Sequence, residues 1–282
     1  MIHTQGGTEL PPGKVLFILG ANGAGKSRLM HHFFKQNSAN AERIWAHRQS
    51  FLSSSGGELT PQSRRQIDDN VKSWNANANA AWIEHSPETR ASTALFDIIE
   101  AENKRARQIA DAVDADKLEN ASGIAAKDRP PIQVINELFR LSNLPITILP
   151  GDYGAIDAKR GTAKAYGINR LSDGERNALL LAAAVLTAKP GRLILIDEPE
   201  RHLHRSIISP LLTHLFEKRK DCAFVVSTHD VTLVTDHSDA QVLLLRGCAF
   251  KDDEPKTWDA DIVMSRRLMM PLKAKYWARA GR

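Results

Sequence analysis

Apolar residues in this chain form short unbroken runs, and these runs alternate with stretches in which apolar residues recur every three or four positions. The unbroken runs are residues 14–19, 192–196, 223–227 and 241–246. A continuous apolar run of this length, bounded by turn residues, is typical of a strand buried on both faces. Residues 175–188 and 206–218 lie between such runs and have helical spacing. The alternation predicts an α/β fold with a mostly parallel sheet and helices packed against it.

The middle of the chain has a different pattern. Residues 43–48 predict one more strand, and a loop rich in Ser, Gly and Pro follows it. Most of the next eighty residues then keep an interrupted apolar face among charged residues, which indicates helices. Turn residues near 151 and 161 predict a hairpin after the helices. We therefore expect a core made of residues 1–50 and 142–260, with an inserted helical lobe over residues 51–141.

Composition places the chain among ordinary globular proteins. The 282 residues are 42% apolar, and 38 basic against 33 acidic residues give a net charge of +5. This charge permits contact with nucleic acid without requiring it. No apolar run approaches the ~20 residues that cross a bilayer, and the first residues lack the features of a secretory leader. Cys222 and Cys248 lie in predicted strands without metal-ligand spacing, so a reducing, cytoplasmic setting without membrane contact is expected.

A glycine-rich loop follows the first predicted strand and precedes a predicted helix. The loop reads GANGAGKS, which fits the spacing G-x-x-x-x-G-K-S. Its glycines let backbone N–H groups approach a phosphate chain, its lysine reaches the outer phosphates, and its serine hydroxyl can bind Mg²⁺. We therefore predict a site for ATP with Mg²⁺. The candidate nucleotide-binding residues are Gly20, Asn22, Gly23, Ala24, Gly25, Lys26, Ser27 and Arg28.

Two adjacent carboxylates, Asp197 and Glu198, stand at the end of a later apolar run. Two neighbouring acids repel each other unless a cation compensates them, and ligands of open α/β sheets bind at this edge. We predict that Asp197 holds Mg²⁺ through water and that Glu198 orients or deprotonates the water that attacks the γ-phosphate. A surface turn is the weaker interpretation, because four apolar residues precede the pair and the chain already contains a phosphate-binding loop.

Two more motifs stand at fixed distances from these carboxylates. LSDGER begins 26 residues before Asp197, directly ahead of a predicted helix, and His229 lies 32 residues after it in VVSTHD. The four motifs together resemble those of ABC-type P-loop ATPases. That resemblance implies an ATP sandwich between two copies of the chain. Within it, Ser172, Gly174 and Glu175 would act on the partner's nucleotide, and His229 would join Lys26 and Glu198 as a catalytic residue.

Details of the motifs indicate a branch of this class. Asp173 stands where transporters usually have glycine, and DEPERHLH replaces the transporter-type sequence after the carboxylate pair. Both are similar to the stand-alone bacterial ATPases, which include RecF-like and OLD-like proteins, and LSDGERNALL resembles defence-associated ATPases that act with a Toprim-like nuclease. The resemblance implies a switch that controls a nuclease or nucleic-acid partner in anti-phage defence. A DNA-repair clamp of RecF or SMC type and a transporter motor subunit are the alternatives.

Three further predictions concern residues outside the main motifs. Gln49 is the candidate for the glutamine that senses the Mg²⁺ site, with Gln62 as second choice. His202 and His204 follow the carboxylate pair, and we expect them in a loop that faces the partner rather than in a metal site. Residues 261–282 form a basic tail, which is either a docking element for a partner or for DNA, or a solvated end.

Overall fold

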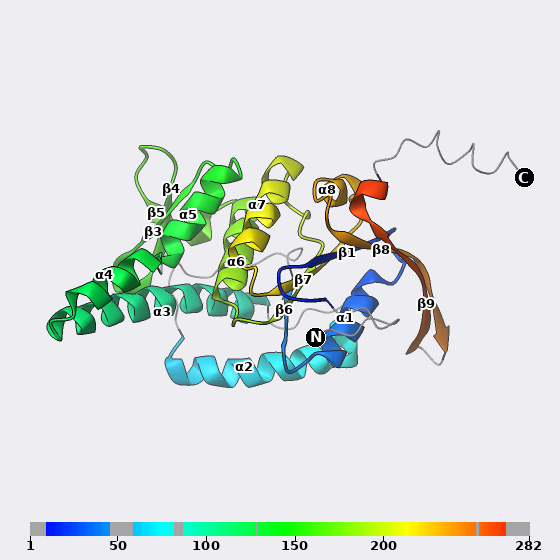
Figure 1. The fold of residues 1–282 in the computed structure, drawn as a ribbon, viewed down its shortest axis with the longest axis horizontal. Coiled ribbons are helices and arrows are strands. Elements are labelled where there is room, and N and C mark those ends of the chain that lie inside the picture. The colour runs from blue at the N-terminus through cyan, green and yellow to red at the C-terminus, as the bar shows by residue number, and fades with distance from the viewer. Residues whose placement is uncertain (1–9, 46–58, 82–86, 128, 252–253, 269–282) are drawn as a thin grey trace, which may run out of the picture.

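The computed structural model describes residues 10–45, 59–81, 87–127, 129–251 and 254–268 (Figure 1). Its main sheet has six strands in the order β2-β6-β7-β1-β8-β9. The first five are parallel and β9 is antiparallel to β8, so the predicted parallel sheet is confirmed. The strands are β1 (Val15–Gly20), β2 (Ala41–Trp45), β6 (Leu193–Asp197), β7 (Ala223–Thr228), β8 (Gln241–Lys251) and β9 (Glu254–Met264).

Both faces of the three central strands are buried, which explains their unbroken apolar sequences. In β6, Leu193 and Leu195 belong to one hydrophobic cluster, whereas Ile194 and Ile196 belong to another on the opposite face. β7 and β1 alternate in the same way, because successive strand residues point to opposite sides. The sheet is therefore the middle layer between two sets of helices.

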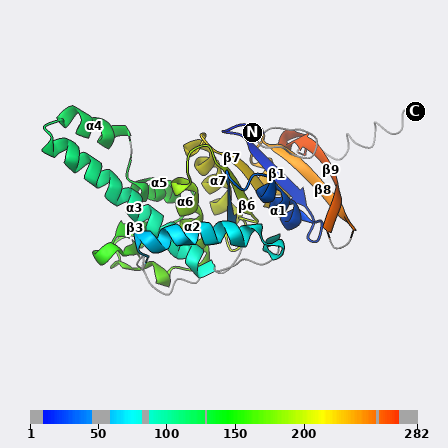
Figure 2. The same cartoon turned by 90° about the horizontal axis from the view of Figure 1, so that it is seen from below.

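Helices of unequal number cover the two faces (Figures 1 and 2). α1 (Lys26–Gln36) packs in the smaller hydrophobic cluster. α6 (Asp173–Thr187), α7 (Arg205–Lys218) and α8 (Val231–Thr235) pack in the larger cluster on the other face. α1 and α6 therefore lie on opposite faces of the same sheet.

The segment between the two parts of the core is helical, as predicted, and a short antiparallel sheet follows it. The elements are α2 (Pro61–Ala76), η1 (Ala78–Ala81), α3 (Pro87–Asp114), α4 (Leu118–Lys127), α5 (Pro131–Leu141), β3 (Thr147–Pro150), η2 (Asp152–Gly154), β4 (Ile156–Lys159), β5 (Tyr166–Gly167) and η3 (Ile168–Arg170). Leu95 and Ile98 of α3 and Ile135 of α5 are buried in the cluster that contains α6. The helices therefore extend the main core, and the lobe boundaries stay a prediction.

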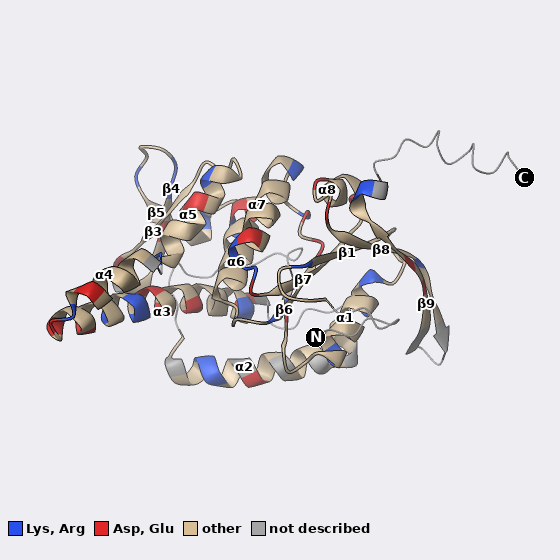
Figure 3. Ribbon diagram, in the orientation of Figure 1, with Lys and Arg blue, Asp and Glu red and all other residues tan. Residues whose placement is uncertain are grey.

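Charge is mixed along the outlying helices. Figure 3 shows acidic and basic residues interspersed on α3 and α4. Lys104 and Arg107 are exposed on α3, and Arg105 donates to the carbonyl oxygen of Ala125 in α4 at 3.2 Å. Charges of both signs therefore occur together in these two helices, which agrees with the modest net charge.

A buried arginine fixes the carboxyl end of α6. Arg219 follows α7, and its guanidinium donates to the carbonyl oxygens of Val185, Leu186 and Ala188 at 2.5, 3.1 and 2.8 Å. Asp221 pairs with the same group at 2.9 Å. These bonds satisfy carbonyl groups that a helix end otherwise leaves without partners. They also attach the end of α6 to the chain that enters β7.

The sequence did not predict β9, and this strand changes the interpretation of the tail. Residues 261–264 complete β9, and η4 (Ser265–Arg267) follows. Ser265 is buried, and its hydroxyl donates to the carbonyl oxygen of Val234 at 2.7 Å. The first residues of the predicted tail therefore belong to the sheet, whereas residues 269–282 and Gln49 lie outside the described residues. In the part of the chain that the structure describes, no helix is long and apolar enough to cross a membrane.

Candidate nucleotide site

The glycine-rich loop joins the end of β1 to the start of α1. Gly23 and Gly25 have φ values of +83° and +99°, which residues with a Cβ atom rarely adopt. Gly25 is the N-cap residue of α1, and no side-chain hydrogen bond caps the helix there. The N–H groups of the first turn can therefore bind an anion, and the helix dipole favours one. The loop thus has the backbone features of a phosphate site.

Lys26 is buried in the first turn of α1, with 5% of its surface exposed. Its Nζ donates to the carbonyl oxygens of Gly20 at 3.0 Å and Ala21 at 3.3 Å. The same Nζ lies 3.5 Å from Oε1 of Glu198. A buried ammonium group needs such partners, because its removal from water is unfavourable. The amine is therefore held between the loop and the carboxylate that the sequence assigns to catalysis.

Asp197 ends β6 and is fully buried, and the two neighbouring strands supply its partners. Its register partner on β7 is Ser227, whose hydroxyl donates to Oδ1. Oδ2 lies 3.3 Å from Nη2 of Arg43, a fully buried side chain from β2. Arg43 in turn lies 3.8 Å over the ring of Trp45 and donates to the carbonyl oxygen of Ala80 at 2.6 Å. A cation of the protein itself therefore compensates the charge of Asp197.

Glu198 takes a different set of partners. Its φ of +47° lies in the left-handed region, so the chain leaves the extended geometry of β6 at this residue. Its N–H donates to the carbonyl oxygen of Ser227 at 3.0 Å. Its Oε2 lies 2.7 Å from Nε of Arg201, and its Oε1 faces Lys26. The two adjacent acids coexist because separate cations compensate them.

His229 follows β7 and approaches the same carboxylate. Its Nδ1 lies 3.9 Å from Oε1 of Glu198 and 3.1 Å from Oε1 of Glu200. That Glu200 oxygen also accepts hydrogen bonds from the Thr228 hydroxyl at 2.6 Å and the His229 N–H at 3.2 Å. Burial raises the pKa of Glu200, although these hydrogen bonds and the nearby imidazole act in the opposite direction. Glu200 thus holds His229 in place beside Glu198.

The predicted metal ligands that the structure describes are Ser27 and Asp197. Nη2 of Arg43 lies between them, 3.3 Å from Oδ2 of Asp197 and 3.5 Å from the backbone oxygen of Ser27. Hydroxyl and carboxylate oxygens are the donors that Mg²⁺ prefers, so the donor types fit this ion. Because Arg43 and Ser227 already bind the two oxygens of Asp197, this carboxylate would hold the ion through water. Among the described residues, no group of three His, Cys, Asp or Glu side chains could hold a metal.

The LSDGER motif begins α6 with a reciprocal capping box. The Glu175 N–H donates to the Ser172 hydroxyl oxygen at 3.3 Å, and the Ser172 N–H donates to Oε2 of Glu175 at 3.0 Å. Burial acts to raise the pKa of Glu175, but bonds from Ser172 and Arg160 outweigh it and hold the pKa below its usual value. A Cβ atom on Gly174 would lie 2.6 Å from the carbonyl oxygen of His202, so only glycine fits.

Four residues of this site were not predicted from the sequence: Arg43, Ser227, Glu200 and Arg201. Of these four, only Arg43 could have been identified from the sequence. An arginine at an inward-facing position of a predicted strand requires a buried acid as its partner. Ser227 and Glu200 lie beside motifs that were identified, but their partners depend on strand register. His204 also has a local role, because its Nδ1 accepts from the Ser206 N–H at 3.2 Å at the start of α7.

Fold and site together define the class of protein. Lys26, Asp197, Glu198 and His229 come from three neighbouring strand ends of a mostly parallel sheet, and the LSDGER helix packs on the face opposite α1. This is the arrangement of an ABC-type P-loop ATPase. Residues 31–235 match the family described as "AAA domain, putative AbiEii toxin, Type IV TA system", and the chain belongs to this family. The match covers more than half of the chain and begins after the glycine-rich loop.

Similarity to individual proteins either covers a short part of the chain or has low sequence identity. A "Putative ABC transporter ATP-binding protein" of Streptomyces avermitilis is 44% identical over 88 residues, which are 31% of this chain and 15% of that protein. An SmcHead structure bound to the C-winged helix domain of ScpA has a TM-score of 0.45 at 16% identity, covering 91% of this chain and 93% of that one. For cbiO1 from Clostridium perfringens the TM-score is 0.41 at 15% identity, with coverages of 97% and 84%.

Proposed function

We propose that this protein binds and hydrolyses ATP with Mg²⁺ and acts as a dimerising switch. In the proposal, ATP binding closes two copies around two nucleotides, and hydrolysis opens them. The change then passes to a nuclease or nucleic-acid partner, in a role in anti-phage defence. The family description, which names a toxin and a toxin–antitoxin system, is compatible with such a role.

One observation carries the enzymatic part of the proposal. Lys26, Glu198 and His229 are far apart in sequence, yet Oε1 of Glu198 lies 3.5 Å from Nζ of Lys26 and 3.9 Å from Nδ1 of His229. A carboxylate between a phosphate-binding lysine and a histidine is placed to orient a water molecule toward a terminal phosphate. Arg43, Arg201 and Glu200 keep the side chains of the site in place.

Each residue has a separate task in this mechanism. The N–H groups of α1 bind the phosphate chain, and Lys26 exchanges its two carbonyl partners for the outer phosphates. Glu198 accepts a proton from the attacking water, and His229 donates a hydrogen bond to the charge that develops on the γ-phosphate. Mg²⁺, held by Ser27 and through water by Asp197, would neutralise phosphate charge.

The dimeric part of the proposal relies on the position of Ser172. This residue is exposed at the amino end of α6, and α1 and α6 belong to hydrophobic clusters on opposite faces of the sheet. A second copy can therefore approach Ser172 without disturbing the core. By the resemblance, Ser172, Gly174 and Glu175 would then face the nucleotide of the other copy.

The Glu198→Gln variant tests the proposal. It removes the proton acceptor but keeps the size of the side chain, so ATP should still bind while turnover falls by at least about 100-fold. A fluorescent ATP analogue measures binding, phosphate release measures turnover, and light scattering should show a dimer that accumulates with ATP. The matched control is Glu217→Gln, which makes the same change on the exposed side of α7.

Two results would contradict this assignment. Turnover of Glu198→Gln close to that of the unaltered protein would exclude Glu198 as the base. A mass that stays monomeric with saturating ATP would exclude the sandwich as the switch. Equal losses in Glu198→Gln and Glu217→Gln would show that the effect does not come from the site.

A further inference from the structure

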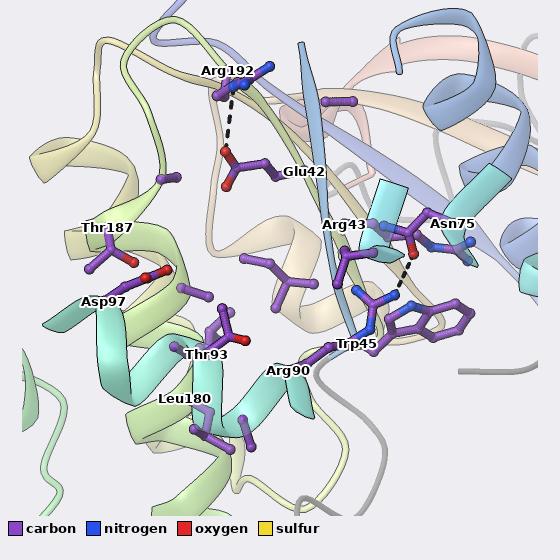
Figure 4. A pocket seen from close by; sticks show the side chains of 18 of the residues that line it. Glu42, Arg43, Trp45, Asn75, Arg90, Thr93, Asp97, Leu180, Thr187 and Arg192 are labelled. Atoms are coloured by element: carbon purple, nitrogen blue, oxygen red, sulfur yellow. Dashed lines mark hydrogen bonds and ion pairs between the residues drawn. The ribbon is translucent and has the colours of Figure 1, made fainter. Parts of the chain in front are cut away.

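A cavity separate from the nucleotide loop lies between the edge of the sheet and the helices α2, α3 and α6. Its volume is about 240 Å³. Figure 4 shows Trp45 and Glu42 of β2 on one side, Thr93 of α3 on another, and Leu180 and Thr187 of α6. A second cavity of about 590 Å³ shares Thr187 and three other lining residues with it. The two cavities are therefore neighbours.

The cavity wall has a positive balance of charge. Among the described residues that line it, five are basic and two, Glu42 and Asp97, are acidic. Both acids pair within the wall, since Asp97 lies 2.7 Å from Nη2 of Arg64 and Glu42 lies 3.5 Å from Nε of Arg192. When Asp197 is also counted against Arg43, the described lining residues still include two more basic than acidic groups. A ligand of opposite charge would be attracted to this wall.

The rest of the wall combines apolar side chains with uncharged polar ones such as Asn75, Thr93 and Asn177. Phe34, Val71, Leu180 and Ala184 line the cavity together with small side chains of α3 and α6. An inorganic anion would leave these surfaces without contacts, whereas a molecule with a ring or chain would cover them. We propose that this cavity binds a small organic anion with an apolar, ring-bearing body, and that this ligand changes the nucleotide site.

The second half of the proposal follows from two connections to the nucleotide site. Arg43 lines the cavity and at the same time binds Asp197, 3.3 Å away. α6 contributes Asn177, Leu180, Ala184 and Thr187, which form one helical face, and its amino end carries Ser172. A ligand in the cavity therefore touches both a partner of Asp197 and the helix that begins at the predicted partner-facing serine. This coupling rests on the proposed ATPase function, whereas binding does not.

The experiment uses 8-anilinonaphthalene-1-sulfonate, an aromatic sulfonate, as the probe. Its fluorescence in a titration of the full chain should rise and saturate, and saturating ATP should not displace it. Ala184→Trp should abolish binding, because the new ring fills the cavity. Arg90→Gln should weaken binding about tenfold, because it removes one charge from the wall. The matched control, Arg107→Gln, makes the same change on the exposed face of α3 and should leave binding unchanged.

Displacement of the probe by ATP would overturn the proposal, because the probe would then occupy the nucleotide site. Equal affinity in Arg90→Gln and Arg107→Gln, or intact binding in a folded Ala184→Trp, would also overturn it. For the coupling, saturating probe should change ATP turnover at least about fivefold in the unaltered protein and not in Ala184→Trp. Unchanged turnover would disprove the coupling alone. A chain without ATPase activity would instead disprove the proposed function, and the titration would still decide on the cavity.

Discussion

The amino ends of α1 and α6 both belong to motifs assigned to ATP, but they are built differently. α1 starts at Gly25 without a side-chain cap and with a lysine in its first turn. α6 starts at Ser172 with a two-way capping box, in which Glu175 also pairs with Arg160. Donors that a chain leaves uncapped are available to a ligand, whereas capped donors already have partners. The N–H groups at the amino end of α1 are therefore open to an anion. At the amino end of α6, the bonds of the capping box would first have to break.

The largest expected effect comes from damage to both ends in separate copies. Lys26→Ala should weaken ATP binding by more than about 100-fold, because it removes the lysine from the uncapped end. Ser172→Arg should keep ATP binding and lose turnover, because it blocks only the capped end. A mixture of the two variants should recover part of the turnover, since one of its two composite sites has both residues intact. Phosphate release measures the recovery.

Two differently tagged variants allow the mixed dimer to be purified. A purified mixed dimer that binds ATP at one site and still shows no turnover would contradict an arrangement in which Lys26 and Ser172 act across two copies. Recovery by Lys26→Ala mixed with a second Lys26 variant would also contradict it. The control mixture therefore contains Lys26→Ala and Lys26→Met.

A change at Arg43 tests how much the buried ion pair between Arg43 and Asp197 contributes to the stability of the fold. Arg43→Met leaves Asp197 buried without its cation, which should lower the free energy of unfolding by about 3–5 kcal/mol. The control is Arg246→Met, which breaks an exposed pair with Asp259 and Asp261 and should lower it far less, because water screens this pair. Urea unfolding followed by circular dichroism measures both. Equal losses would show that the Arg43 pair contributes no more than a surface pair.

His31, a buried residue of α1, should make the free energy of unfolding depend on pH. Burial, with nearby Arg43 and Lys35, lowers the pKa of His31 to about 4. Between that value and the ordinary histidine pKa near 6.5, the unfolded chain binds the proton that the folded chain excludes. The free energy of unfolding should therefore fall as pH drops through this window, by about 2–3 kcal/mol in total.

The His31→Met variant isolates this contribution. It should flatten the dependence of unfolding free energy on pH between about 7 and 4. Urea titrations at four or five pH values provide the comparison. The same slope in His31→Met and in the unaltered protein would mean that His31 does not titrate differently on folding.

The smallest effect belongs to the capped end. Ser172→Ala should lower the free energy of unfolding by about 1 kcal/mol, because it removes an N-cap, and Ser172→Asp should recover this loss, because aspartate caps equally well. Turnover should fall in both variants, since neither offers a neutral hydroxyl to the partner's phosphates. Recovery of turnover in Ser172→Asp would assign Ser172 to capping alone. Thermal unfolding and phosphate release are measured on the same samples.

The amino end of α1 and the parallel strands could be predicted from the sequence, whereas several contacts of the site could not. Unbroken apolar runs predicted the parallel strands, because only a strand buried on both faces needs them, and the glycine-rich loop predicted the start of α1. The pair of Arg43 with Asp197 could not be predicted from the sequence, because it depends on β2 lying next to β6. β9 was missed because its sequence mixes charged and apolar residues at an exposed edge, where no continuous apolar run is needed.

Because Arg219 fixes one end of α6, a small tilt of this helix displaces its other end. The three carbonyl bonds described above fix its carboxyl end as a pivot, while 15 residues at about 1.5 Å each place Ser172 about 22 Å away. A tilt of about 5° around that pivot moves the serine by about 2 Å over this length. That distance exceeds half the length of a hydrogen bond. A small rotation of one helix would therefore be sufficient to make or break the proposed contact between two copies.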